Sequence, residues 1–144
     1  KIIPSGNWVV DLQRFSEAIK NKIWSATRTD MAMIGGITNG KKAMDISELG
    51  GLDCEIMSWG YTLVSVANLH LMLSSNICSF YEQPLPYETF EFGMKDVLRT
   101  SKDGYMYAPT KPGLGMEINW DKMKKKLIHT FYCDKNKKIG LVHS

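Results

Sequence analysis

The feature that most constrains this chain is a nearly constant interval between the residues that end its short apolar runs. Asn7 follows Ile2-Ile3, Asp30 comes 23 residues later, Met57 another 27 later, and Glu82 a further 25 later. One strand and one helix joined by short loops need about that length. The interval therefore predicts consecutive strand-helix units, and such units build a parallel sheet.

Helical patterns fill the intervals between these positions. A helix over residues 11–24 begins at a suitable N-cap, Asp11, and has an apolar stripe at spacings of three and four. A second helix is expected to start at Thr38 or Asn39. Residues 63–73 are apolar on nearly all sides, which is typical of a helix packed on both sides. Strands are expected at 2–3, 27–34, 53–57 and 77–81.

After Glu82 the alternation of strands and helices stops, and prolines and glycines become frequent. Asp103-Gly104 predicts the turn of a hairpin with arms at 96–99 and 105–107. A last amphipathic helix is expected over residues 119–129. The predicted fold class is α/β, with about four parallel βα units followed by a hairpin and a C-terminal helix.

Parallel strands of α/β enzymes carry their chemistry at the carboxyl ends, which form one shared mouth in a barrel. Asn7, Asp30 and Glu82 are therefore expected to converge, although they are far apart in the sequence. An eight-stranded barrel needs about 250 residues. Four units are half of such a barrel, so we expect these 144 residues to be part of a larger enzyme.

The composition is that of a globular protein, with 44% hydrophobic and 23% charged residues. No apolar run approaches the roughly 18 residues of a membrane-spanning helix, and the first residues have no apolar signal-peptide core. Cys54, Cys78 and Cys133 are widely spaced, which fits reduced thiols better than disulfides or a zinc site. We expect a cytoplasmic protein that has no membrane partner.

The positive charge is concentrated at the C-terminus. Residues 121–144 hold seven lysines against two aspartates, which leaves residues 1–120 with a net charge of −2. These lysines are not interleaved with arginines or exposed aromatic residues, so the pattern favours a solvated helix face over a nucleic-acid site. We expect no nucleic-acid partner. A basic nucleic-acid-binding domain stays an alternative, which requires that removing residues 121–144 abolish binding.

Four stretches, in order along the chain, resemble the C-terminal half of the enolase superfamily, and most closely its mandelate racemase and acid-sugar dehydratase branch. They are Asp30–Thr38 with the helix after it, the helix around His70-Leu71, Glu82-Gln83-Pro84 and Lys111–Ile118. The resemblance covers about residues 2–125. It implies that residues 1–125 form the C-terminal half of a (β/α)7β barrel and that residues 126–144 form a return segment or tail.

In this superfamily a magnesium ion and a base remove the proton next to a carboxylate. Such a proton is not acidic enough to leave at neutral pH unless a metal and hydrogen-bond donors hold the enolate. The resemblance implies an acid-sugar dehydratase that uses Mg²⁺, although no ordered Mg²⁺ is expected in these residues alone. The alternatives are a racemase or epimerase of the same branch and a non-catalytic relative that binds sugar acids.

The resemblance also implies partners. The expected ligand is a small carboxylic or sugar acid. A half-barrel leaves strand edges unpaired, so we expect a homo-oligomer or association with an N-terminal part that carries the first metal ligands. The substrate itself is not predicted, since the specificity loops of this superfamily come largely from a separate capping domain.

Three residues receive roles from the resemblance. Asn7 falls where the superfamily has its third metal-binding carboxylate, and its amide oxygen is a neutral ligand for Mg²⁺; a turn cap is the alternative role. Asp30 matches the aspartate that orients a histidine base, or else fixes the Gly35-Gly36 turn. Glu82 matches the acid at the end of the last strand, which binds a substrate carboxylate or acts as an electrophile.

The chain departs from the superfamily pattern at the end of the third predicted strand. A histidine base is expected near Met57, but residues 53–62 contain none, and His70 lies on an apolar helix. Trp59 or Tyr61 is expected to line the mouth and contact substrate instead, unless it only packs within its loop. The general base is then expected among lysines on an earlier strand that this chain does not contain.

Overall fold

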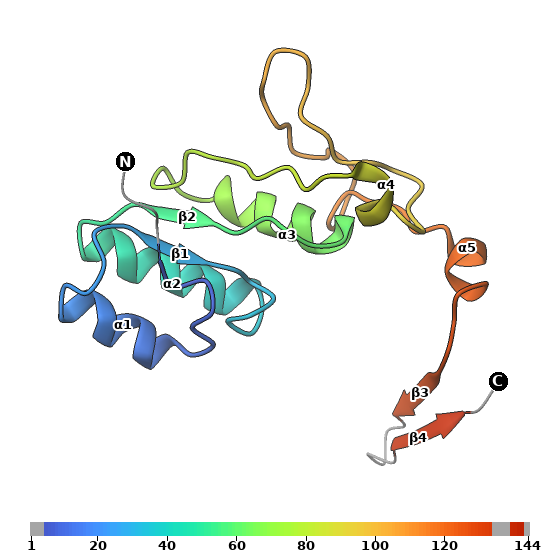
Figure 1. Cartoon of the computed structure of the whole chain (residues 1–144), viewed down its shortest axis with the longest axis horizontal. Coiled ribbons are helices and arrows are strands. Elements are labelled where there is room, and N and C mark those ends of the chain that lie inside the picture. The colour runs from blue at the N-terminus through green and yellow to red at the C-terminus, as the bar shows by residue number, and fades with distance from the viewer. Residues whose placement is uncertain (1–4, 134–138, 143–144) are drawn as a thin grey trace.

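The computed structural model describes residues 5–133 and 139–142. Its first part alternates helices and strands in the order α1 (Leu12–Lys20), β1 (Thr27–Thr29), α2 (Ile37–Leu49), β2 (Cys54–Ile56) and α3 (Thr62–Met72) (Figure 1). Strands β1 and β2 pair in parallel, with Thr27 opposite Cys54 and Thr29 opposite Ile56. This arrangement confirms the α/β class. Over the described ranges, no helix is long and apolar enough to cross a bilayer.

The helix ends follow from local hydrogen bonding. The Asp11 carboxylate accepts a hydrogen bond from the Arg14 backbone N–H at 2.8 Å, which confirms Asp11 as the N-cap of α1. Helix α1 ends at Lys20, earlier than expected, and Lys22 follows with a positive φ of 54°. The N-cap expected for α2 at Thr38 or Asn39 is wrong, because the helix already begins after Gly36.

Helix α3 lies between two parts of the core, as its sequence predicts. Leu71 and Met72 pack with residues of α2 and β2, namely Met44, Cys54 and Ile56. Val66 and Leu69 instead pack with Leu98 from the C-terminal half of the chain. A third cluster, formed by Phe15, Ile34 and Ala43, lies between α1 and α2. Because α3 is covered on two sides, it needs no polar face.

The strand expected at 77–81 is wrong. The Ile77 carbonyl accepts a hydrogen bond from the Cys54 N–H at 2.9 Å, but residues 77–81 do not form a strand. The Glu55 carboxylate accepts hydrogen bonds from the backbone N–H groups of Ser79 and Phe80, both at 3.2 Å. In a strand pair, backbone carbonyl groups would accept such hydrogen bonds. The Glu55 side chain therefore helps to hold residues 77–81 beside β2.

A backbone contact continues the sheet on its other side. Ser5 forms a parallel bridge with Thr27, and the Ser5 carbonyl accepts a hydrogen bond from the Arg28 N–H at 2.8 Å. The strand expected at 2–3 lies outside the described residues. About four parallel units were expected. Within the described residues, two strands are paired and one further segment lies along each side of the pair.

The second half of the chain has short elements. After α4 (Tyr87–Phe90) and a long loop come α5 (Trp120–Lys124) and an antiparallel hairpin of β3 (Thr130–Cys133) and β4 (Ile139–Val142). The turn expected at Asp103-Gly104 is present, but the strands expected at 96–99 and 105–107 are not formed, so that predicted hairpin is wrong. Helix α5 begins where expected, directly after its N-cap Asn119, and is shorter than expected.

Candidate functional site

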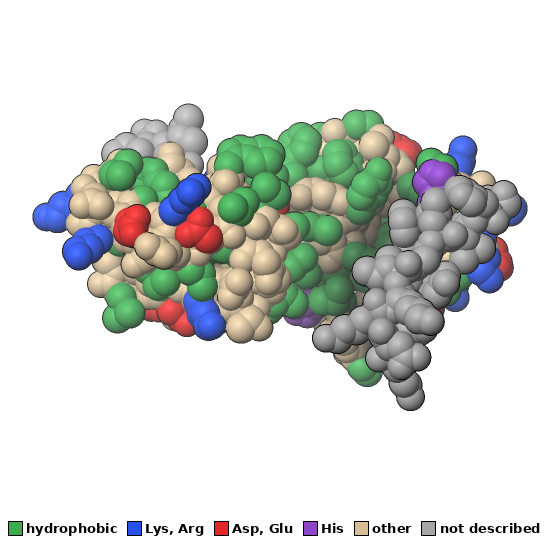
Figure 2. Space-filling view, turned by 90° about the horizontal axis from the view of Figure 1, so that it is seen from below, with side chains coloured by type: hydrophobic (Ala, Val, Ile, Leu, Met, Phe, Trp, Pro, Cys, Tyr) green, Lys and Arg blue, Asp and Glu red, His purple; other side chains and the backbone are tan. Residues whose placement is uncertain are grey.

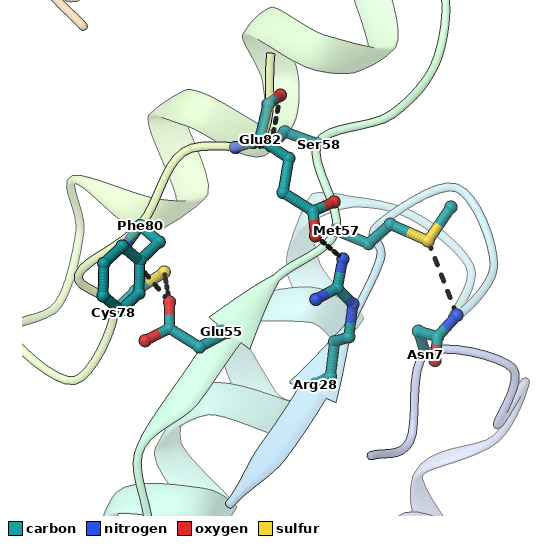
Figure 3. A network of polar contacts seen from close by, with 8 residues as sticks. All are labelled: Asn7, Arg28, Glu55, Met57, Ser58, Cys78, Phe80 and Glu82. Carbon is teal, nitrogen blue, oxygen red and sulfur yellow. Dashed lines mark hydrogen bonds and ion pairs between the residues drawn. The ribbon is translucent and has the colours of Figure 1, made fainter. Parts of the chain in front are cut away.

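Side chains from four segments gather beyond the carboxyl ends of the parallel strands. Asn7 follows the segment beside β1, Met57 follows β2, Glu82 follows the 77–81 segment, and Arg28 reaches up from β1 (Figure 3). Asn7 and Met57 point toward each other, as do Arg28 and Glu82. The structure therefore brings together two of the predicted site residues, Asn7 and Glu82, with two residues that had no predicted role.

The position of Asn7 is fixed by the glycine before it. Gly6 has a φ of +120°, and a Cβ atom added there would lie 2.8 Å from the Arg28 carbonyl oxygen and 3.0 Å from the Phe15 ring. Only glycine combines this backbone angle with such a close approach. The half-buried Asn7 then donates a hydrogen bond from Nδ2 to the Met57 Sδ atom, at 3.5 Å.

Arg28 and Glu82 form the charged centre of the site. In β1, Thr27 and Thr29 are fully buried, while Arg28 between them points to the other face of the sheet. Its Nη2 atom donates a hydrogen bond to Glu82 Oε1, and the side chains are 18% and 31% exposed. The second carboxylate oxygen, Oε2, is buried and has no hydrogen-bond partner among the described residues.

The backbone of Glu82 is held separately from its side chain. The buried Ser58 hydroxyl accepts a hydrogen bond from the Glu82 N–H at 2.9 Å and donates one to the Glu82 carbonyl at 3.1 Å. The Ser58 carbonyl in turn accepts a hydrogen bond from the Ser65 hydroxyl on α3, at 2.7 Å. These contacts fix the position of the Glu82 backbone at the mouth.

Asp30 is placed differently from the other two predicted residues. It is 4% exposed, and its Oδ1 atom accepts hydrogen bonds from the Ala32 N–H and from Asn68 Nδ2, both at 2.9 Å. The Asn68 side chain also accepts a hydrogen bond from the Met31 N–H, at 3.1 Å. Asp30 thus ties the turn after β1 to α3, and its role in orienting a base stays a prediction.

Trp59 and Tyr61 lie in the loop between β2 and α3. Trp59 is 47% exposed and packs edge-on against Phe90, with 5.8 Å between ring centroids. Tyr61 is 63% exposed and is the N-cap residue of α3. The contact with Phe90 places Trp59 beside the C-terminal half of the chain. A substrate contact by either ring stays a prediction.

The thiols near the sheet are poor nucleophiles. Burial raises the pKa of Cys78 to about 12 and also raises the pKa of Cys54. Burial likewise raises the pKa of Tyr81 to about 12. His70 lies with Nε2 3.2 Å from the Leu114 carbonyl oxygen, as expected for a packed histidine. The raised pKa values of the two thiols and of the Tyr81 hydroxyl make these three groups poor nucleophiles and bases at neutral pH.

The residues that gather at the mouth do not by themselves fit Mg²⁺. Within residues 5–133 and 139–142 there is no group of three or more His, Cys, Asp or Glu side chains placed to hold a metal ion. Asn7 offers one neutral oxygen, and its amide contacts the thioether of Met57. Mg²⁺ prefers hard oxygen ligands and is usually held by one or two carboxylates.

The sequence reasoning missed Arg28 and Ser58. The signal for Arg28 was present, because a charged residue between two residues that a strand buries must face the open side of a sheet. Ser58 carried no comparable signal, since a serine two residues past a strand is ordinary loop composition. Ser58 holds the Glu82 backbone only because Glu82, which is 24 residues later in the sequence, lies beside it in the fold.

Comparison with known proteins shows the family of this chain. Residues 3–122 match the family described as enolase C-terminal domain-like. The D-galactonate dehydratase family member RspA of Pantoea ananatis is 34% identical over 122 residues, which are 81% of this chain and 28% of RspA. The chain belongs to the enolase C-terminal domain-like family, in the branch of the mandelate racemases and acid-sugar dehydratases.

Two solved structures show the same fold. A mandelate racemase/muconate lactonizing enzyme relative from Pseudovibrio sp. superposes with a TM-score of 0.83 at 37% identity and covers 97% of this chain and 36% of its own. An enolase from Pantoea ananatis with bound D-gluconate and Mg gives a TM-score of 0.69 at 31% identity, over 79% of this chain and 28% of its own. The chain spans about three tenths of the length of the curated relatives that it matches.

Proposed function

We propose that this chain forms one side of the mouth of an acid-sugar dehydratase of the enolase superfamily, and that this mouth binds a small sugar acid. The observation that carries the proposal is the Arg28–Glu82 pair, in which Arg28 binds one carboxylate oxygen, while the other is buried and has no hydrogen-bond partner among the residues that the structure describes. The family assignment supports it, since RspA is named for galactonate dehydratases and one solved relative holds D-gluconate.

The pair has the chemistry that a hydroxy acid requires. A guanidinium has five N–H donors in a planar fork that suits a carboxylate, and the contact with Glu82 Oε1 uses one of them. Glu82 Oε2 accepts no hydrogen bond from residues 5–133 or 139–142, and a sugar hydroxyl would supply one. Arg28 would therefore bind the acid group, and Glu82 would bind a hydroxyl beside it.

The proposed reaction is removal of the proton next to the carboxylate and loss of the hydroxyl on the adjacent carbon. In this proposal the base comes from a part of the enzyme other than residues 53–62, which contain no histidine. Mg²⁺, where bound, would supply charge to stabilise the enolate. In this proposal Asn7, at the mouth, would be a neutral oxygen ligand for the ion.

A non-catalytic sugar-acid-binding relative is the second candidate. The observation that favours it is the neutral Asn7, whose amide contacts the Met57 sulphur. This candidate keeps the acid-binding pair and lacks turnover. A racemase is a third outcome, in which the proton returns to the opposite face and no water is lost.

The proposal is tested by D-gluconate binding to the protein expressed from its complete reading frame. Replacing Arg28 with Met is expected to weaken binding about tenfold or more, because charge-assisted hydrogen bonds contribute about 1.5–3 kcal/mol each. Arg14→Met is the matched control, since Arg14 is 80% exposed on α1 and pairs with Asp11. Equal affinities for both variants and the wild type, or no binding of any sugar acid by the wild type, would contradict the proposal.

A further inference from the structure

We infer that Ser58 is a positioning residue of this mouth, because its hydroxyl holds the Glu82 backbone so that the Glu82 carboxylate meets a bound sugar acid in one fixed orientation. The contact between Ser58 and Glu82 belongs to the fold, whereas its consequence for turnover rests on the proposed function. Two features support the inference: the strand pairing ends before Glu82, and Ser58 is itself held by the core.

The first step concerns the backbone of Glu82. Strand β2 ends at Ile56, and residues 77–81, which precede Glu82, form no strand. A neighbouring strand would offer backbone donors and acceptors at this place. Here the Ser58 hydroxyl offers both, since it accepts a hydrogen bond from the Glu82 N–H at 2.9 Å and donates one to the Glu82 carbonyl at 3.1 Å. One side chain thus does for Glu82 what a strand neighbour does in a regular sheet.

The second step concerns what holds Ser58. Its side chain is fully buried, and its carbonyl accepts a hydrogen bond from the Ser65 hydroxyl at 2.7 Å. The same Ser65 hydroxyl lies 3.1 Å from the Gly60 carbonyl oxygen, so it binds the loop at two points. Ser65 is in α3, which packs into the core on two sides. Ser58 is therefore a rigid support, as a residue that positions another must be.

The third step concerns the Glu82 side chain. Several rotatable bonds separate its backbone from its carboxylate. Ser58 holds the backbone end, and Arg28 in β1 binds the carboxylate end (Figure 3). With both ends held, the buried Oε2 atom has a defined place next to a bound acid. Loss of the Ser58 hydroxyl releases the backbone end, and small displacements of a reacting or binding group lower reaction rates strongly.

The contact itself is tested by hydrogen exchange at the Glu82 amide, in the protein expressed from its complete reading frame. Ser58→Ala removes the acceptor of this amide, so we expect exchange about tenfold faster than in the wild type. Ser47→Ala is the matched control, because Ser47 is an equally buried serine whose hydroxyl donates to the Ala43 carbonyl and accepts from Thr27. Equal exchange of the Glu82 amide in the two variants would overturn the inference.

A second variant covers the case in which Ser58→Ala does not fold. Ser65→Ala keeps the Ser58 hydroxyl and removes the hydrogen bond that holds the Ser58 carbonyl. We expect the Glu82 amide to exchange faster in Ser65→Ala than in Ser47→Ala, by a smaller factor than in Ser58→Ala. Equal exchange in Ser65→Ala and Ser47→Ala would mean that α3 does not support Ser58, and would also overturn the inference.

The consequence for turnover is tested by steady-state kinetics with D-gluconate and millimolar Mg²⁺. We expect kcat of Ser58→Ala to fall about tenfold or more relative to Ser47→Ala. KM should change less than about threefold, because Arg28 keeps its place in β1 and still binds the acid group. A global loss of folded protein would lower the amount of active enzyme in both variants, which circular dichroism of each variant measures.

The outcomes separate this inference from the proposed function. Equal kcat in Ser58→Ala and Ser47→Ala, or a change in KM alone, would overturn the positioning role and leave the proposed function intact. A wild type that turns over no sugar acid would reject the proposed dehydratase and, with it, the role of Ser58 in turnover. The Glu82 amide would still decide whether Ser58 holds Glu82.

Discussion

At the scale of single residues, the charged centre of the site depends on which carboxylate pairs with Arg28. Arg28 and Glu55 are opposite each other in the register of β1 and β2, and cross-strand neighbours of opposite charge commonly pair. Here Arg28 contacts Glu82, and Glu55 contacts residues 78–80. The sequence indicates Glu82 and Asn7 as site residues, but the partner of Arg28 depends on the path of a segment 54 residues away.

A prediction at this scale concerns Cys78 and pH. The unfolded thiol ionises near its ordinary pKa of 9.0, whereas in the folded protein burial raises the pKa to about 12. Between these values the unfolded state releases the proton first, so the free energy of unfolding falls as pH rises. Urea unfolding at pH 8.0 and 9.8 should show a smaller loss of stability in Cys78→Ala than in the wild type.

Cys54 is present in both of these proteins, so the difference between them isolates Cys78. The tyrosines, whose ordinary pKa is about 10, are also the same in both proteins, so their ionisation does not contribute to the difference. Parallel pH dependences in the two proteins would show that the Cys78 thiol ionises in the folded state as it does in the unfolded chain.

At the scale of secondary-structure elements, local signals predicted the first half of the chain well and the second half poorly. Helix α3 is apolar on all sides because two clusters pack against it, and periodicity alone indicates this. The apolar run at 77–81 predicts a strand, but a side chain, that of Glu55, satisfies its backbone. The local sequence does not show whether a neighbouring strand or a carboxylate side chain accepts the hydrogen bonds of residues 77–81, so this difference could not be predicted.

The Glu55 contacts give a prediction at this scale. Its carboxylate accepts hydrogen bonds from the Ser79 hydroxyl, the Cys78 thiol and two backbone N–H groups. Glu55→Gln replaces one acceptor oxygen with an N–H₂ donor, so we expect the Ser79 and Phe80 amides to exchange hydrogen about tenfold faster. Hydrogen exchange followed by NMR measures this change.

The matched control for Glu55→Gln is Glu48→Gln, at an exposed position on α2. That variant should leave both amides unchanged. Equal protection of Ser79 and Phe80 in the two variants would mean that Glu55 does not hold the 77–81 segment.

At the scale of the whole molecule, the exposed apolar surface points to further association. Figure 2 shows hydrophobic side chains gathered over the middle of one face, with most charged side chains toward the ends. Large apolar residues are exposed elsewhere as well, including Trp8, Ile23, Leu49 and Leu73. Exposed patches of this kind mark interaction surfaces.

We therefore expect the 144-residue chain expressed alone to self-associate in a concentration-dependent manner. Sedimentation velocity over about a hundredfold range of concentration is the appropriate measurement. A single monomeric species across that range would contradict this expectation.

The central claim is that the mouth serves acid-sugar dehydration. The most direct measurement follows D-gluconate and related sugar acids by proton NMR in D₂O, with millimolar Mg²⁺ and the protein from its complete reading frame. The proposal predicts loss of the signal of the proton next to the carboxylate and growth of a 2-keto-3-deoxy acid, with both rates much reduced in Glu82→Gln and unchanged in Glu48→Gln. Sugar acids that bind but neither exchange that proton nor lose water would contradict the dehydratase assignment and identify a binding protein.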